Sequence, residues 1–140
     1  MKNGSKLIGT NVDHVDRVEN NQIAPSCGSL IGLMQVSTGA IPYFLGKPNA
    51  FMFRSGIEAM GADRKSSLMI GDRMDTDVVG AMESGIDTLL VLSGVTNLND
   101  LGKYSFSPTY ILGGVNELVE VIHANTPSDI SLKAMRSSGS

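Results

Sequence analysis

Residues 69–77 have the sequence Met69-Ile70-Gly71-Asp72-Arg73-Met74-Asp75-Thr76-Asp77. A short apolar run, Leu68 to Ile70, ends at this glycine, and apolar residues then recur at helical spacing at Val78, Val79 and Met82. The pattern predicts a buried strand, a tight turn and a helix, with the carboxylates beside the positive end of the helix. Mg²⁺ prefers a few carboxylate oxygens together with water and substrate phosphate. The spacing therefore indicates a metal-assisted phosphate site.

A simpler interpretation of this acidic turn stays open. Aspartate is favoured in turns and at helix starts, so Asp75 or Thr76 would cap the following helix. In that case Asp72 and Asp77 would be solvated. Short acidic loops are common at helix amino termini, and the turn alone does not decide between the two interpretations.

A second apolar run ends in a conspicuous turn. Residues 43–45, Tyr-Phe-Leu, are followed by Gly46-Lys47-Pro48. In an open parallel sheet, ligands bind beyond the carboxyl ends of the strands, so Lys47 and Asp72 are expected to converge on one anion and its metal. Lysine suits phosphate as a point charge. The alternative for Lys47 is a solvated turn residue, which is the usual environment of a lysine.

Together these segments resemble the haloacid dehalogenase (HAD) superfamily over most of the chain. Its third and fourth motifs are similar to Gly46-Lys47-Pro48, with the helix that begins at Asn49, and to residues 71–77. Residues 85–96 are similar to the subgroup that contains the ribonucleotide monophosphatase NagD and the nitrophenyl phosphatases. Residues 9–13 and 28–30 resemble the cap domain of that subgroup.

The resemblance implies roles for particular residues of a magnesium-dependent phosphate monoester hydrolase. Lys47 would be catalytic, because it would stabilise the phosphoryl group and the nucleophile. Asp72 would bind Mg²⁺ directly, and Asp77 would support the metal site through neighbouring contacts. Asp75 and Arg73 would lie at the periphery of the metal site.

The resemblance also implies a substrate-binding loop in the cap. Asn11, Asp13 and His14 precede a polar segment that, in the family, lies over a phosphorylated small molecule. His14 would read the substrate or carry a proton, since its ordinary pKa suits both roles. A solvated surface histidine between Asp13 and Asp16 is the alternative.

One part of the family pattern is missing from this chain. The family nucleophile is the first aspartate of an Asp-x-Asp motif that follows an apolar strand. The only such spacing here, Asp75-Thr76-Asp77, lies inside the metal-binding run. Without the nucleophile, the lysine and the metal ion can only position and polarise the phosphate. We therefore expect little or no turnover from this chain by itself.

Two further classes of function stay open. A non-catalytic fragment or interaction module would dimerise or complement another chain through an open sheet edge. A phosphate-binding or nucleotide-binding domain of another family is supported only by glycine-rich turns, because no Gly-x-Gly-x-x-Gly, Gly-Lys-Ser or Gly-Lys-Thr occurs.

The expected fold class is α/β. We expect a partial cap domain at residues 1–45, the carboxyl-terminal half of a Rossmann-like HAD core at 46–125, and a disordered tail at 126–140. Strands and helices alternate from Tyr43 onwards, which predicts β-α-β crossovers and one parallel sheet with flanking helices.

Composition bounds the possible partners. A length of 140 residues with 41% hydrophobic content suits about one small domain. The net charge of −3 argues against nucleic acid, which needs a basic surface. No apolar run approaches the about 20 residues of a membrane helix.

The single Cys27 suits a reducing compartment, and we expect the cytoplasm. An open sheet edge would favour a homodimer or association with another chain.

Overall fold

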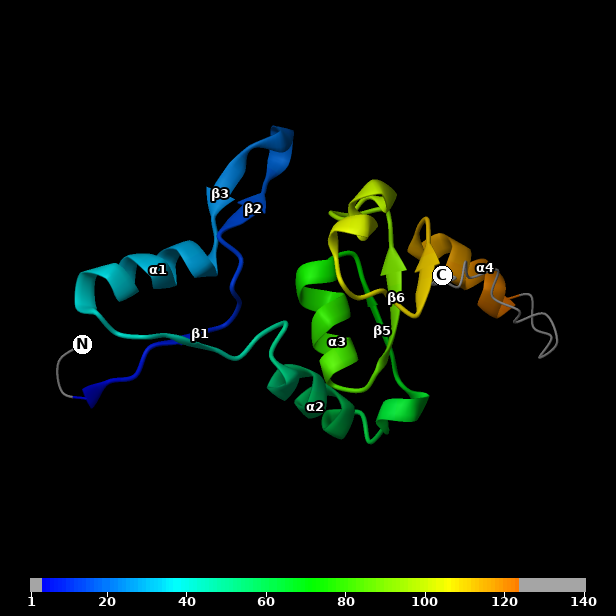
Figure 1. Ribbon diagram of the computed structural model, residues 1–140, viewed down its shortest axis with the longest axis horizontal. Helices are drawn as coiled ribbons and strands as arrows, with labels where there is room; N and C mark the ends of the chain where they lie inside the picture. Colours follow the sequence, from blue (N-terminus) through cyan, green and yellow to red (C-terminus); the bar gives the residue numbers. More distant parts are fainter. Residues whose placement is uncertain (1–3, 124–140) are drawn as a thin grey trace. The chain divides into compact units, whose positions relative to one another are not determined.

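The computed structural model describes residues 4–123 (Figure 1). They divide into two compact units, with the division between Met52 and Phe53. The predicted domain boundary between residues 45 and 46 stays a prediction, and the predicted tail at 126–140 lies outside the described residues. Within residues 4–123, no helix has both the length and the apolar character needed to cross a membrane.

The first unit contains two small sheets and one long helix. Its elements are β1 (Ile8–Gly9), β2 (Val15–Arg17), η2 (Glu19–Asn21), β3 (Ile23–Pro25), α1 (Cys27–Thr38) and β4 (Tyr43–Phe44). β1 pairs in parallel with β4, whereas β2 and β3 form an antiparallel pair. Helix α1 ends at Gly39, whose φ of 70° is the left-handed conformation that glycine adopts at low cost.

The expectation that the Tyr43 strand joins the sheet of the acidic turn is wrong. Among residues 4–123, β4 pairs only with β1, with Tyr43 opposite Ile8 and Phe44 opposite Gly9. The segment from β1 to β4 thus closes a parallel pair of its own, with α1 in the connection. Periodicity identifies a strand but does not identify the strand with which it pairs.

The second unit is an α/β layer structure. Its elements are η3 (Arg64–Ser66), β5 (Leu68–Gly71), η4 (Met74–Val78), α3 (Val79–Glu83), β6 (Asp87–Val91), η5 (Leu98–Lys103), β7 (Tyr110–Leu112) and α4 (Val115–His123). Helix α2 (Ala50–Ala59) spans the division between the units. The strands form a parallel sheet in the order β5-β6-β7, as expected for an α/β fold with flanking helices.

Two apolar clusters hold the second unit together. Phe53, Ala81 and Ile86 form one, with Ile57 and Met69 packed against it, so α2 and α3 share a face of the sheet. The other contains Met74, Val78 and Leu90, with Leu92, Leu101, Tyr104, Phe106 and Ile111 packed around it. Both clusters fix η4 and α3 against the sheet, and so they position the acidic turn at the carboxyl end of β5.

The opposite face of β5 is less well covered. Ile70 stands opposite Leu89 in the parallel register, yet Ile70 is 38% exposed whereas Leu89 is 1% exposed. Leu68 on the same strand is 42% exposed. Within the described residues β5 is also the outer strand of its sheet. Among the described residues, the outer strand of this sheet therefore has exposed apolar side chains.

Candidate functional site

The acidic turn leaves the carboxyl end of β5 and enters a widened helical turn. The N–H groups of Asp77 and Val78 both donate to the carbonyl oxygen of Arg73, at 3.0 and 3.1 Å. The bond from Val78 spans five residues, so η4 is a turn of π-helix that continues into α3. Such single π turns are frequent at functional sites. Within this turn the Asp77 carboxylate folds back on the backbone N–H groups of Asp72 and Arg73.

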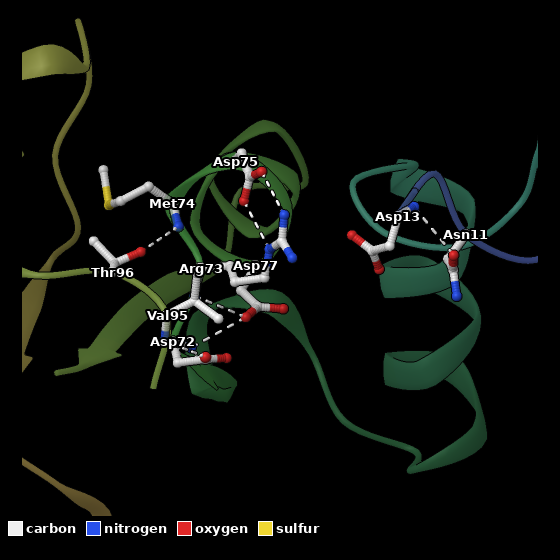
Figure 2. A network of polar contacts seen from close by, with 9 residues as sticks. All are labelled: Asn11, Asp13, Asp72, Arg73, Met74, Asp75, Asp77, Val95 and Thr96. Atoms are coloured by element: carbon white, nitrogen blue, oxygen red, sulfur yellow. Dashed lines mark hydrogen bonds and ion pairs between the residues drawn. The ribbon is translucent and has the colours of Figure 1, made fainter. Parts of the chain in front are cut away.

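Asp77 is a buried support of this turn. Its side chain is 2% exposed, and Oδ2 accepts the N–H groups of Asp72 and Arg73, both at 3.1 Å (Figure 2). A Cβ on Gly71 would overlap the Asp77 side chain, so this approach requires glycine. The alternative in which Asp77 is a solvated turn residue is therefore wrong.

Asp72 lies between two strand ends. It follows β5 directly and is half-buried, and its Oδ2 accepts the N–H of Val95 at 2.8 Å. Its carbonyl oxygen accepts the N–H of Thr96 at 3.0 Å. Both donors come from the loop that follows β6, the parallel neighbour of β5. Asp72 is thus held in place by backbone N–H groups more than twenty residues away in the sequence, one at its carboxylate and one at its carbonyl oxygen.

Arg73 and Asp75 form a bidentate ion pair at the surface. Nε of Arg73 donates to Oδ1 of Asp75 at 3.0 Å, and Nη2 donates to Oδ2 at 2.7 Å (Figure 2). These hydrogen bonds hold the pKa of the Asp75 carboxyl below its ordinary value. The two aspartates of Asp75-Thr76-Asp77 therefore have separate partners, a guanidinium for Asp75 and backbone N–H groups for Asp77.

The donor chemistry of this turn suits magnesium. Within the part of the chain that the structure describes, no three His, Cys, Asp or Glu side chains gather as a metal cluster. Mg²⁺ does not require one, because it binds through one or two carboxylates and completes its octahedron with water and phosphate oxygens. Asp72 offers a hard carboxylate oxygen at the carboxyl end of the sheet. Direct binding of Mg²⁺ by Asp72 and support of the metal site by Asp77 stay predictions.

The remaining predicted site residues belong to the first unit. Lys47 follows β4 and is half-buried, and Asn11 and Asp13 lie in the loop after β1. Because β1 and β4 are parallel, their carboxyl ends lie together, and Gly46 approaches the carbonyl of Thr10 so closely that a Cβ would overlap it. The fold thus brings the Lys47 turn beside the predicted substrate loop. Convergence of Lys47 with Asp72 stays a prediction.

The predicted substrate loop is tied to the start of α1. Oδ1 of Asn11 accepts the N–H of Asp13 at 3.1 Å. The His14 side chain is exposed, while its carbonyl oxygen accepts the N–H of Ser26 at 3.0 Å and the hydroxyl of Ser29 at 2.6 Å. These bonds order the loop backbone. They leave the substrate roles of Asn11, Asp13 and His14 as predictions.

Sequence reasoning missed the contribution of Gly94, Val95 and Thr96. They lie within residues 85–96, which resemble the NagD subgroup, but no role at the site was predicted for them. Their position after a buried strand was the available signal, because the carboxyl ends of adjacent parallel strands share one edge of the sheet. Pairing of β6 with β5 is what brings them to Asp72.

Comparison with known proteins agrees with this architecture. Residues 44–118 match a family model described as HAD-hydrolase-like. The chain is 40% identical over 117 residues to the dihydroxyacetone phosphatase of Corynebacterium glutamicum (strain R), a match that covers 84% of this chain and 42% of the relative. It is 32% identical over 118 residues to the ribonucleotide monophosphatase NagD of Escherichia coli (strain K12), covering 84% of this chain and 46% of NagD.

Solved structures give the same result. The crystal structure of a 4-nitrophenylphosphatase from Thermotoga maritima superposes with a TM-score of 0.76 at 30% identity, covering 85% of this chain and 46% of that one. NagD from E. coli K-12 superposes with a TM-score of 0.74 at 33% identity, covering 82% and 44%. The chain spans less than half the length of these relatives.

Proposed function

The chain belongs to the family of HAD-like hydrolases, in the subgroup of NagD and the nitrophenyl phosphatases, and we propose that it forms the carboxyl-terminal part of a magnesium-dependent phosphate monoester hydrolase. Relatives that are named as phosphatases support the reaction class. The observation that carries the proposal is the environment of Asp72 at the carboxyl end of a parallel sheet. Its carboxylate accepts the N–H of Val95, and its backbone N–H donates to the Asp77 carboxylate.

In this proposal each predicted residue has a distinct task. Asp72 holds the cation, and Asp77 fixes the backbone from which Asp72 projects. A bound Mg²⁺ supplies charge neutralisation at the phosphate oxygens. Lys47 adds a point charge to the phosphoryl group, and the loop that contains Asn11, Asp13 and His14 contacts the rest of a phosphorylated small molecule.

The family's nucleophile motif, an apolar strand followed by Asp-x-Asp, is not found in this sequence. Its single Asp-x-Asp sequence is engaged elsewhere, because Asp75 pairs with Arg73 and Asp77 is buried against backbone N–H groups. In the mechanism that the family resemblance implies, the nucleophile is an aspartate carboxylate that faces the phosphorus atom. We therefore expect the chain to supply metal and phosphate positioning but little or no turnover by itself.

A second candidate function is a non-catalytic module that dimerises or complements another chain. The open edge of β5 favours it, because Leu68 and Ile70 are 42% and 38% exposed on an outer strand. Open strand edges with apolar side chains pair readily with other polypeptides. The two functions are compatible, since a hydrolase that is divided between chains would assemble through such an edge.

The proposed location is the cytoplasm. A single cysteine among 140 residues excludes an internal disulfide and suits a reducing compartment. Cys27 is half-buried, and its thiol accepts the hydroxyl hydrogen of Thr10 at 3.3 Å.

The test combines metal binding with turnover. The full chain, Asp72→Ala and the exposed control Asp75→Ala are titrated with Mg²⁺ while amide ¹H–¹⁵N shifts are recorded, and each is assayed with p-nitrophenyl phosphate. We expect saturable shifts around residues 71–77 in the original chain and in Asp75→Ala, none in Asp72→Ala, and no turnover in any of them.

Two results would contradict the proposal in different ways. If Mg²⁺ produced no saturable shifts in the folded original chain, the site would not be a metal site. If the original chain hydrolysed the ester and Asp72→Ala abolished this turnover, another residue of the chain would be the nucleophile, and our view of the chain as an incomplete hydrolase would be wrong.

A further inference from the structure

Three residues of the loop after β6, Gly94 to Thr96, lie against Asp72. Val95 donates its N–H to Oδ2 of Asp72 at 2.8 Å, and Thr96 donates its N–H to the Asp72 carbonyl oxygen at 3.0 Å. Gly94 approaches the same side chain so closely that a Cβ would overlap it. Three consecutive residues of one loop therefore contact one aspartate.

The hydroxyl of Thr96 fastens this loop to the start of η4. Thr96 is 5% exposed, and its Oγ1 accepts the N–H of Met74 at 3.3 Å (Figure 2). The first N–H groups of a helix have no partner within the helix and need an outside acceptor. The Met74 N–H is such a donor in a buried position. Thr96 supplies its acceptor from a residue 22 positions away.

Three polar groups of Asp72 consequently have defined hydrogen-bond partners. Its N–H points to Oδ2 of Asp77, its carbonyl oxygen accepts from Thr96, and its own Oδ2 accepts from Val95. This leaves the side-chain torsions of Asp72 little freedom. It also distinguishes the two carboxylate oxygens, because Oδ2 is occupied by a backbone donor.

We infer that Thr96 is a positioning residue for the cation: through Met74 and the Asp72 carbonyl it holds the loop that orients the Asp72 carboxylate, which would hold Mg²⁺. This inference rests on the proposed function of Asp72. Groups that orient a metal ligand change metal affinity about 10–100-fold when they are removed. A rigid carboxylate binds more tightly because less conformational freedom is lost on binding.

The chain contains a matched control for the Thr96 hydroxyl. Thr88 is also a buried threonine, 3% exposed, and its Oγ1 accepts the backbone N–H of Thr109 at 2.8 Å. It lies at the amino-terminal end of β6, whereas Thr96 follows the carboxyl-terminal end. Thr88→Val thus removes the same kind of bond from the same unit, at the far end of the strand.

The experiment measures Mg²⁺ affinity of the full ¹⁵N-labelled chain from amide shifts at constant ionic strength. Thr96→Val is expected to raise the dissociation constant about tenfold or more. Thr96→Ser keeps the hydroxyl and should restore an affinity close to that of the original chain. Thr88→Val should lower the unfolding midpoint in urea and leave the affinity unchanged.

The outcomes separate the inference from the function on which it rests. If the original chain does not bind Mg²⁺, the proposed function fails and the positioning role fails with it. If the original chain binds and Thr96→Val binds equally well, or if Thr88→Val weakens binding as much as Thr96→Val does, only the positioning role is overturned.

A second variant decides the question if Thr96→Val does not fold. Gly94→Ala places a methyl group against the Asp72 side chain at an exposed position. It is expected to weaken Mg²⁺ binding, whereas Gly102→Ala, where a Cβ meets no atom within 4 Å, is expected to leave it unchanged. Equal affinities for these two variants would overturn the positioning role.

Discussion

At the scale of single residues, burial separates the three aspartates of the acidic turn. Asp77 is 2% exposed and bonds to backbone, Asp72 is half-buried between two loops, and Asp75 is in an exposed ion pair. The sequence shows three similar carboxylates within six residues. Their different environments arise because the widened turn directs each side chain to another partner, so their mutational effects should differ widely.

Replacement of Asp77 by alanine should destabilise the second unit strongly. Two backbone N–H groups, those of Asp72 and Arg73, would lose their acceptor, which costs about 2–4 kcal/mol of unfolding free energy. Asp75→Ala is the control, because loss of an exposed ion pair costs about 0–1 kcal/mol. Urea unfolding followed by circular dichroism measures both, and equal losses would contradict the structural role of Asp77.

The Asp75 carboxyl should titrate below its ordinary pKa of 3.8, because the Arg73 guanidinium donates to it. A lowered pKa in the folded state means that the pair stabilises the protein above about pH 4, and that this contribution is lost as pH falls through the lower value. The ¹³Cγ shift of Asp75 followed against pH gives the midpoint. Arg73→Gln should return it toward 3.8, and an unchanged midpoint would exclude Arg73 as the cause.

At the scale of elements, replacing glycine by alanine should have opposite effects on stability at two positions. Gly71 ends β5 where a Cβ would overlap Asp77, whereas Gly56 lies inside α2 with no atom within 4 Å of a Cβ. Gly71→Ala should therefore destabilise the second unit by about 1–3 kcal/mol through overpacking. Gly56→Ala should stabilise it by about 0.5–1 kcal/mol through helix propensity. Thermal unfolding compares the two, and shifts of the same sign would contradict the argument.

Strand pairing was the element-scale feature that the sequence predicted least well. The Tyr43 run was identified as a strand and was expected to join a parallel sheet with the later strands, but it pairs with β1 instead. A two-residue strand such as β4 contains no information about register or partner. Its pairing is decided by α1, which returns the chain to β1.

At the scale of the whole molecule, the open edge of β5 should govern association. We expect the weight-average mass in sedimentation velocity to rise with concentration, since apolar outer strands pair with other chains. Ile70→Lys places a charge on this strand and should weaken self-association about tenfold or more. Met60→Lys is the control, because Met60 is 70% exposed and lies outside the strands of the sheet. Equal effects of the two lysines would show that the edge is not the interface.

The sequence by itself determined the local features of this protein. Apolar runs that alternate with helical spacing determined the α/β class, and the residues after Ile70 determined an acidic strand-to-helix turn. These features depend on residues within a few positions of one another, and periodicity and turn chemistry record such relations directly. The family membership follows from the same short motifs.

Only the tertiary structure decided what surrounds those motifs. It buried Asp77 and paired β4 with β1. It also brought Val95 to Asp72, 23 positions away in the sequence, and the Thr96 hydroxyl to Met74, 22 positions away. The physical reason is that parallel strand pairing juxtaposes loops that are distant along the chain. No local pattern around Thr96 specifies which buried N–H its hydroxyl will accept, so its role emerges only when the sheet is assembled.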